Sequence, residues 1–289
     1  MNTLYVVATP IGNLEDISPR ALRILAEVDL IAAEDTRRTG KLLTHFGIDT
    51  PTTSYYKFNE KSRAEQLVSR ILQEKVDIAL VSDAGTPCIS DPGGVLVKLA
   101  HERGIQVLPI PGASSVAAAL SVCGFEFSSF AFVGFVPREN KPKAEFWSKI
   151  KRSEIDVHVI FESGHRILQT VADLAEYFPN SELCLVNDIS KLYECYYFGS
   201  TSEVNSVMMK NDKANLGEYT LVLQCGKLDK VAEDEQPFSP EAMLVDEIVK
   251  NGTTLSEAIS SLSEKQSDFS RNQLYKASLN LKKMQLPAE

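Results

Sequence analysis

The sequence of 289 residues predicts an α/β protein with two domains and a small C-terminal helical module. Short apolar strands alternate with helical segments, which is typical of a largely parallel sheet covered by helices. The chain is also long for one hydrophobic core, because single cores stop growing near roughly 250–300 residues. We therefore expect an N-terminal α/β domain at residues 1–135, a second α/β domain at 136–228 and a helical module at 238–289.

The elements of the first domain follow from local patterns. A buried strand at 4–8 precedes a helix to about residue 27, which begins where Ser18 can act as N-cap and Pro19 occupies the first helical position. The same alternation gives further strands and helices. Strands are expected at 29–33, 77–82, 105–110 and 130–135, and helices from Thr36, after Pro92 and from about Ala113.

The second half begins with the charged, proline-containing segment 136–145, where we expect the domain boundary. The later strands are rich in tyrosine and β-branched residues, which favours partly antiparallel pairing. Strands are expected at 157–163, 183–187, 194–200 and 218–225, with a helix after the first of them. The acidic segment 226–240 predicts a linker, and three amphipathic helices follow at 242–250, 255–262 and 272–284.

The composition excludes several classes of protein. No basic stretch precedes the first short apolar run, and no apolar run approaches the 18–20 residues or so that cross a bilayer, so we expect a cytoplasmic protein without membrane contact. Neither the five cysteines nor the four histidines have the spacing of metal ligands, so no metal site is expected. A net charge of −9 argues against a general nucleic-acid binder but leaves local RNA contacts possible.

Three turn-rich loops leave strands of the expected parallel sheet. They are Thr9-Pro10-Ile11-Gly12-Asn13, Ser82-Asp83-Ala84-Gly85-Thr86-Pro87 and Pro111-Gly112-Ala113-Ser114-Ser115. Ligands of such sheets bind beyond the carboxyl ends of the strands, where glycine allows close backbone approach and aspartate accepts hydrogen bonds. Any single loop of this kind is also an ordinary tight turn, but three at one edge favour a site for a small polar ligand. Neither G-x-G-x-x-G nor a P-loop is present, which disfavours dinucleotide and nucleoside triphosphate sites.

Longer motifs make the interpretation specific. The runs TPIGNLEDISPRALRIL, DLIAAEDTRRTGKLLTHFGI and ALVSDAGTPCISDPG, at 9–25, 29–48 and 79–93, resemble the RNA-modifying members of the tetrapyrrole-methylase-like family. KFNE, PGASS, GFVPR, FESGHR and SRNQLYKASLNL extend the resemblance nearly end to end.

The resemblance implies a two-domain enzyme, a homodimer, that uses S-adenosyl-L-methionine to methylate the 2′-hydroxyl of a cytidine in small-subunit ribosomal RNA. Motif by motif, it implies the following cofactor-binding residues: Pro10, Asp83, Ala84, Gly85, Thr86, Ser114, Ser115, Glu162 and Leu216.

Glu34, Asp35 and Arg37 are our candidate catalytic residues, because they stand where the second strand ends and a helix starts, outside the three loops. The acidic pair alone is also typical of helix capping. A ribose hydroxyl needs a positioned base or a donor array, but no single residue is identified as the base.

Two departures from the family pattern bear on function. Asn187-Asp188 stands where the family has a basic–acidic pair, and Leu216 stands where it has lysine. Two alternative functions therefore stay open: methylation of a tetrapyrrole or another small molecule, and ribosome assembly without turnover. The basic residues of the terminal module, Lys265, Arg271, Lys276, Lys282 and Lys283, indicate either RNA phosphate contacts or a solvated helix face.

Overall fold

The structure is a computed structural model of the chain, and it describes residues 2–227, 229, 239–264 and 269–283. The first sheet has five strands in the order β3-β2-β4-β1-β5, and every pairing in it is parallel. Its strands are β1 (Thr3–Val7), β2 (Leu30–Ala33), β3 (Thr52–Ser54), β4 (Ile78–Val81) and β5 (Gln106–Ile110). The predicted parallel sheet is confirmed, with β3 added at its edge.

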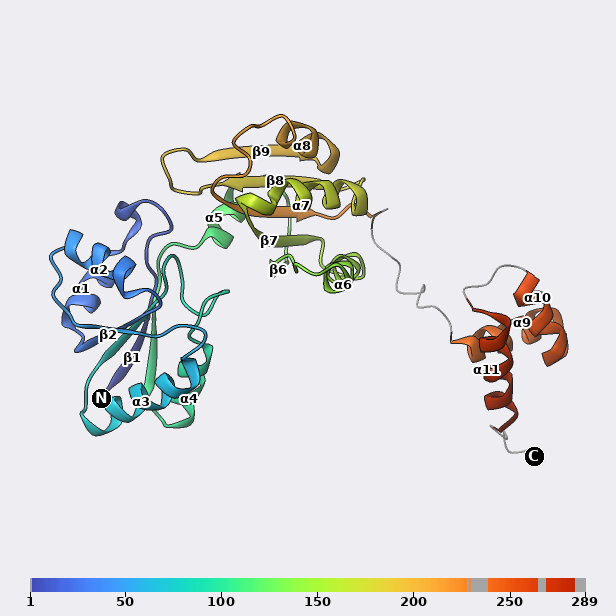
Figure 1. Cartoon of the computed structure of the whole chain (residues 1–289), viewed down its shortest axis with the longest axis horizontal. Coiled ribbons are helices and arrows are strands. Elements are labelled where there is room, and N and C mark those ends of the chain that lie inside the picture. The colour runs from blue at the N-terminus through green and yellow to red at the C-terminus, as the bar shows by residue number, and fades with distance from the viewer. Residues whose placement is uncertain (1, 228, 230–238, 265–268, 284–289) are drawn as a thin grey trace. The chain divides into compact units, whose positions relative to one another are not determined.

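Helices cover both faces of this sheet (Figure 1). Ile78 and Leu80 of β4 pack on one face, and Ala79 and Val81 pack on the other. The first face carries α3 (Glu60–Gln73) and α4 (Gly94–Glu102), and the second carries α1 (Pro19–Glu27) and α2 (Thr36–His45). Burial on both faces explains why the inner strands β2 and β4 are apolar throughout instead of alternating with polar residues.

The second sheet is mixed, in the order β6-β7-β10-β8-β9. Its strands are β6 (Phe130–Phe135), β7 (Val157–Ser163), β8 (Glu182–Asn187), β9 (Cys195–Ser200) and β10 (Glu218–Gln224). β6 is parallel to β7, and the other pairings are antiparallel, as the residue types of the later strands predicted. One face packs on α5 (Ser115–Val122), and the other on α6 (Asn140–Lys151), α7 (Gly164–Tyr177) and α8 (Thr201–Met208).

The strand at 130–135 is where sequence and structure differ. The sequence grouped it with the first domain, whereas the structure pairs it with β7 of the second sheet. α5 also packs on the second sheet, where Ala119 and Cys123 contact strand residues such as Val159. We infer that the first domain ends after β5 and that the crossing between the sheets lies near residues 111–114.

The three glycine-containing loops lie at one edge of the first sheet, as predicted, because β4, β1 and β5 are adjacent and parallel. Thr9 and Gly85 exchange backbone hydrogen bonds, with N–O distances of 2.9 and 3.0 Å. The Thr86 hydroxyl donates to the carbonyl of Ala113 at 3.3 Å. These bonds hold the three loops together as one surface.

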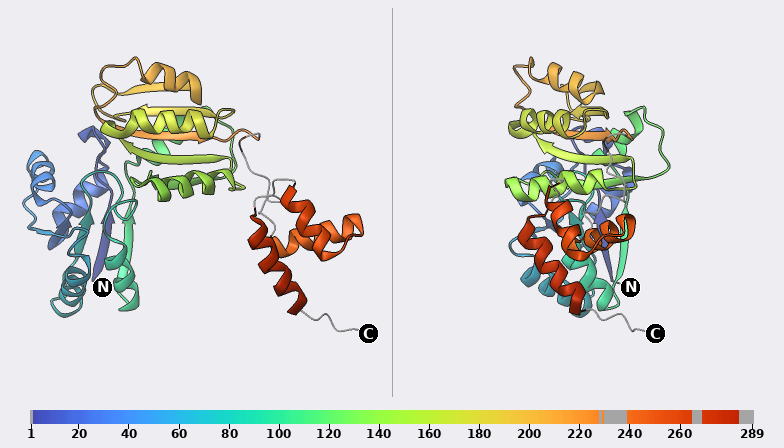
Figure 2. Two further views of the ribbon diagram at one scale, coloured as in Figure 1. Left: turned by 45° about the vertical axis from the view of Figure 1, so that its right-hand side comes forward. Right: turned by 90° about the vertical axis from the view of Figure 1, so that its right-hand side faces the viewer.

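The described residues after position 238 form a compact unit of their own. Three helices are described there, α9 (Pro240–Asn251), α10 (Leu255–Glu264) and α11 (Arg271–Lys283), and they pack against one another (Figure 2). Their core contains Leu244, Leu262 and Leu274. The helices of the predicted module are thereby confirmed. Most of the predicted linker at 226–240 lies outside the described residues, as does Lys265. Among the described helices none is long and apolar enough to span a membrane.

Candidate functional site

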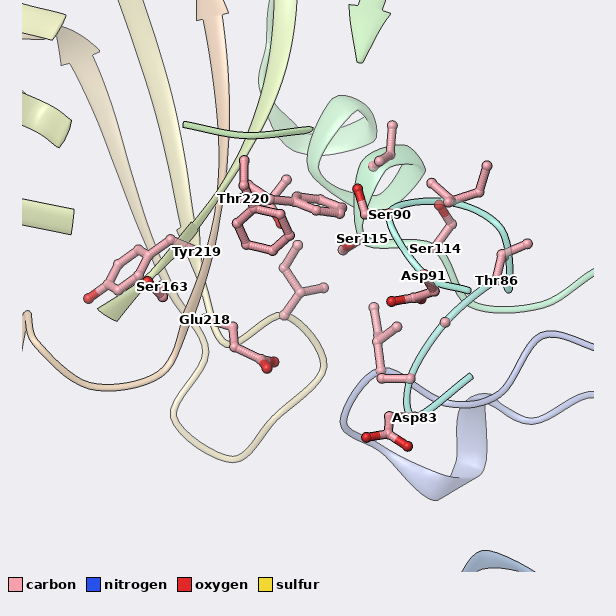
Figure 3. Close-up of a pocket in the computed structure, with 18 of the residues that line it drawn as sticks. Asp83, Thr86, Ser90, Asp91, Ser114, Ser115, Ser163, Glu218, Tyr219 and Thr220 are labelled. Carbon is pink, nitrogen blue, oxygen red and sulfur yellow. The ribbon is translucent and has the colours of Figure 1, made fainter. Parts of the chain in front are cut away.

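A cavity of about 430 Å³ lies where the loops of the first sheet face the second sheet (Figure 3). Its volume falls in the range of small-molecule sites, roughly 300–1,000 Å³. Seven predicted cofactor-binding residues line it: Asp83, Ala84, Gly85, Thr86, Ser114, Ser115 and Glu162. Pro10 lines an adjoining cavity, whereas Leu216 is exposed and lines neither of these two cavities.

The loop after β4 requires glycine at position 85. The Gly85 φ of +76° lies in the left-handed region that glycine adopts without strain. A Cβ here would also come within 3.3 Å of the Ile11 side chain. Glycine therefore lets this loop bend back to pair with Thr9 and keeps Ile11 at the cavity wall.

Asp83 joins the ends of β2 and β4 through both its backbone and its side chain. One carboxylate oxygen accepts the Asp35 backbone N–H at 3.0 Å, and the other lies 3.3 Å from Arg38. In return, the Asp83 backbone N–H donates to Glu34 at 3.3 Å. Burial raises the pKa of Glu34, and the charge of Asp83 adds to that effect. The two acids therefore brace each other at the cavity wall.

The three predicted catalytic residues take different positions. Glu34 lines the cavity, whereas the Asp35 carboxylate caps α2 by accepting the Arg37 backbone N–H at 2.9 Å. Side-chain hydrogen bonds from Arg37 lower the pKa of Asp35. The Arg37 side chain is 88% exposed and does not line the cavity, whereas its neighbour Arg38 does. The structure thus brings one of the three candidates to the cavity and uses Asp35 as a helix cap.

Glu162 forms the second-sheet wall, where it is buried. It accepts hydrogen bonds from the Ser163 backbone N–H at 2.8 Å, the Ser163 hydroxyl at 3.2 Å and the Thr170 hydroxyl at 2.8 Å. Arg166 lies 3.5 Å away and also donates to the carbonyl of Pro137. Because a buried charge is tolerated when it is paired and hydrogen-bonded, Glu162 fixes the turn between β7 and α7.

Lys191 is a cavity residue that the sequence did not single out. Its ammonium group lies 2.6 Å from Asp188 and 2.9 Å from Glu218. A Cβ on Gly12 would come 2.5 Å from the Lys191 side chain, so the loop after β1 needs glycine to pass this lysine. Asp188, at one of the departures from the family pattern, therefore has a structural role in holding Lys191.

Further cavity residues were not among the predicted site residues. They include Asp91, Phe135, Phe161, Glu218 and Tyr219. Asp91 lies only eight positions after Asp83, in the same strand-end loop, which is the signal that could have identified it. Phe135, Phe161, Glu218 and Tyr219 come from strands of the second sheet, whose approach to the first sheet has no local sequence signal.

Comparisons with known proteins agree with this architecture. The profile of the tetrapyrrole (corrin/porphyrin) methylases matches residues 3–205, and the chain belongs to that family. The uroporphyrin-III C-methyltransferase of Thermus thermophilus, solved with S-adenyl homocysteine, has the same fold, with a TM-score of 0.52 at 14% identity over 77% of this chain and 97% of that one.

Within the family, the chain belongs with the proteins named ribosomal RNA small subunit methyltransferase I. The relative from Synechocystis is 41% identical over 97% of this chain and 99% of its own length. The relative from Neisseria meningitidis serogroup B is 44% identical over 76% of this chain and 75% of its own length. The resemblance inferred from the motifs is therefore confirmed.

Proposed function

We propose that this protein transfers a methyl group from S-adenosyl-L-methionine to the ribose 2′-hydroxyl of a cytidine in small-subunit ribosomal RNA. The observation that carries the proposal is the similarity to proteins named for methylating that RNA. The similarity to the Synechocystis relative extends over 97% of the chain at 41% identity. It includes the segments that line the cavity, at residues 34–38, 83–91 and 114–116.

The cavity suits the cofactor chemically. Glu34 and Asp83 provide negative charge for a sulfonium and an ammonium group. Ser114 is the N-cap of α5 and makes no side-chain capping bond, so this helix start, which lines the cavity, offers N–H donors to a carboxylate. Apolar walls for the nucleobase of the cofactor come from Ile11, Phe135 and Phe161. When bound, S-adenosyl-L-methionine supplies a methyl group activated by its sulfonium.

The residues of the chain contribute mainly by orientation. Methyl transfer is an in-line displacement, and well-oriented reactants gain roughly 7–11 kcal/mol over reactants that meet by diffusion. The bonds that tie Thr9 to Gly85, and Asp83 to Glu34, make the first-sheet wall rigid. Glu162 does the same for the second-sheet wall by anchoring Ser163 and Thr170.

We also infer that the protein works as a cytoplasmic homodimer. β5 and β6 are edge strands of their sheets, and Phe130 of β6 and the Phe127 ring that contacts it are both exposed. Exposed apolar patches of this kind commonly mark subunit interfaces. Light scattering should then give twice the chain mass of 31.9 kDa, and a mass of one chain would contradict the dimer.

The proposed reaction is tested with tritium-labelled S-adenosyl-L-methionine and small ribosomal subunits from cells that lack the gene. Label should enter the RNA. The labelled RNA strand should resist alkaline cleavage at one nucleotide, because a 2′-O-methyl group removes the hydroxyl that attacks the adjacent phosphate. Label in a tetrapyrrole instead would support the small-molecule alternative. Binding to subunits without any transfer would support an assembly role.

A further inference from the structure

Methylation of a hydroxyl requires a base that can take its proton, and the cavity offers a limited choice. No histidine lines it among the described residues, the Lys191 ammonium is paired with two carboxylates, and the Tyr219 hydroxyl donates to the carbonyl of Ala214, so the candidates are carboxylates. They are Glu34, Asp83, Asp91, Glu162, Asp188 and Glu218. A carboxylate already engaged by several donors is a weaker base and has fewer lone pairs for a substrate.

Most of these carboxylates are already engaged. Asp83 accepts a backbone N–H and contacts Arg38, and Glu162 accepts three hydrogen bonds. Asp188 accepts the Glu218 backbone N–H at 3.2 Å and the Lys191 ammonium, and the same ammonium holds the Glu218 carboxylate. Two candidates are left, Glu34, which supports the Asp83 backbone, and Asp91.

Asp91 is held in place by its loop. Cys88 and Ser90 just before it have φ values of +70° and +66°, a left-handed conformation that non-glycine residues adopt only where their surroundings enforce it. Just after it, the Gly93 backbone N–H donates to Glu60 at 2.9 Å. Strain of this kind at a cavity wall is typical of functional segments.

Two further contacts brace the same loop from behind. The Tyr55 hydroxyl donates to Glu60 at 3.3 Å and accepts the backbone N–H of Leu96 at 3.2 Å. Gly93 is also required, because a Cβ there would come 2.5 Å from the Cys88 sulfur. The Asp91 backbone is therefore fixed on both sides.

The side chain of Asp91 lies on the first-sheet side of the cavity, across from Glu218 and Tyr219, and its carboxylate points toward the interior (Figure 3). Among the described residues, the Asp91 carboxylate has a side-chain hydrogen bond with Ser82. Ser82 itself is buried and directly follows β4.

We propose that Asp91 is the general base of the methyl transfer, an inference that rests on the proposed function. A lone pair of the 2′-oxygen forms the new oxygen–carbon bond, and the carbon–sulfur bond breaks with its electron pair going to sulfur. The hydroxyl proton passes to a carboxylate oxygen of Asp91, so that charge and atoms balance.

The surroundings make Asp91 a better base than an exposed aspartate. Burial raises its pKa to about 6, and the negative charges of Glu34 and Asp83 act in the same direction. The positive charges that line the cavity are Arg38 and Lys191, which are paired with other carboxylates, and Glu218 adds negative charge from the second sheet. Because the base acts only when ionised, kcat/KM should rise with pH and level off above a pKa near 6.

The test compares Asp91→Asn with Glu34→Gln, which removes the competing carboxylate. Asp91→Asn should lower kcat by about 10²–10⁴-fold and abolish the rise of kcat/KM between about pH 5 and 7. Calorimetry with S-adenosylhomocysteine should give a dissociation constant within about threefold of wild type. The melting temperature of each variant checks that it folds. Glu34→Gln should keep the rise with pH.

Three results would overturn the assignment. The rise with pH could persist in Asp91→Asn, it could disappear in Glu34→Gln instead, or Asp91→Asn could weaken S-adenosylhomocysteine binding more than about tenfold, which would make Asp91 a cofactor ligand. A wild-type protein that transfers no methyl group to small subunits would overturn the proposed function itself. Failure of the two proposals is therefore distinguishable.

Discussion

Arg37 and Arg38 are neighbours in sequence at the start of α2 but have different surroundings. Arg37 bonds to the capping residue Asp35 in an exposed pair, which contributes little to stability. Arg38 reaches the other way, to Asp83 at the cavity wall. The helical turn thus directs one guanidinium to solvent and one to the proposed cofactor site.

This difference predicts separate kinetic effects for the two residues. Arg38→Ala should weaken S-adenosyl-L-methionine binding by about threefold to tenfold, because Asp83 loses a charged partner. Arg37→Ala should raise the KM for small subunits and leave cofactor affinity unchanged, because its exposed guanidinium is available to an RNA phosphate. Calorimetry and steady-state kinetics on both variants measure these effects. Equal loss of cofactor affinity in both would assign Arg37 to the cofactor site as well.

At the residue scale, the sequence predicts which loops line the ligand site. It predicts less well which hydrogen bonds and ion pairs each side chain of those loops makes. Asp83 and Gly85 stand in a turn-rich segment after an apolar strand, a local pattern that predicts their position. The hydrogen bond between the Asp83 backbone and Glu34 joins residues 49 positions apart, and the cavity wall opposite Asp91 belongs to another sheet. No local pattern contains that information.

Among the elements, α6 was not predicted because its first turn resembles a loop. Pro142 is the third residue of this helix, where a missing N–H breaks no intrahelical hydrogen bond. Its apolar face is short but well buried, with Trp147 and Ile150 in the core of the second sheet. For α3 the signal was present, since Ala64, Leu67, Val68 and Ile71 have helical spacing and are all buried.

No local sequence pattern predicts that β6 belongs to the second sheet. Its apolar run predicts a buried strand, but strand pairing is a long-range property that the run itself does not encode. In the structure β6 pairs with β7, and the register shifts between Phe132 and Gly134, where Gly134 has a φ of +73°. This bulge turns Phe135 into the cavity wall.

A glycine at the start of α7 allows a test at the scale of elements. A Cβ on Gly164 would lie 2.6 Å from the carbonyl oxygen of Asn215 and 2.7 Å from Leu216, both backbone atoms. Gly164→Ala should therefore lower the free energy of unfolding by roughly 1–3 kcal/mol. It should also weaken cofactor binding, because the same turn carries Glu162 and Ser163.

Gly40 within α2 is the matched control. A Cβ on this residue would meet no neighbouring group within 4 Å, so Gly40→Ala should leave stability unchanged or raise it by up to about 1 kcal/mol. Urea denaturation of both variants measures the difference. A Gly164→Ala protein as stable as Gly40→Ala would show that the 215–217 segment moves away at no cost.

For the whole molecule, the charges are distributed unevenly. The chain carries −9 overall, and acidic residues outnumber basic ones around the cavity. That balance suits a cationic cofactor but not RNA phosphates, so the contacts with RNA must lie elsewhere. Exposed basic side chains are found on α2, as Arg37 and Lys41, and on α11, as Arg271 and Lys276.

The helical module has a surface suited to such contacts. A groove of about 360 Å³ lies between α10 and α11, lined by Arg271, Tyr275 and Lys282 among others. Tyr275 is 59% exposed, so its ring is available for stacking on a base. The same features would also fit a solvated helix face, and the two interpretations differ in their salt dependence.

Deleting the residues after about 238 should raise the KM for small subunits, flatten the salt dependence of subunit binding and leave cofactor affinity unchanged. The reason is that each Lys or Arg that neutralises a phosphate releases counterions, so removing two such contacts should reduce the slope of log K against log salt by roughly 1–2. In the full chain, Arg271→Glu with Lys282→Glu should have the same effect. Lys250→Glu is the control, because Lys250 lies on α9, is paired with Asp246 and does not line the groove. The module would be structural if the double variant kept the salt slope, or if the truncated protein lost both its dimer and its cofactor binding. RNA contacts would then be sought at Arg37, Arg38 and Lys41.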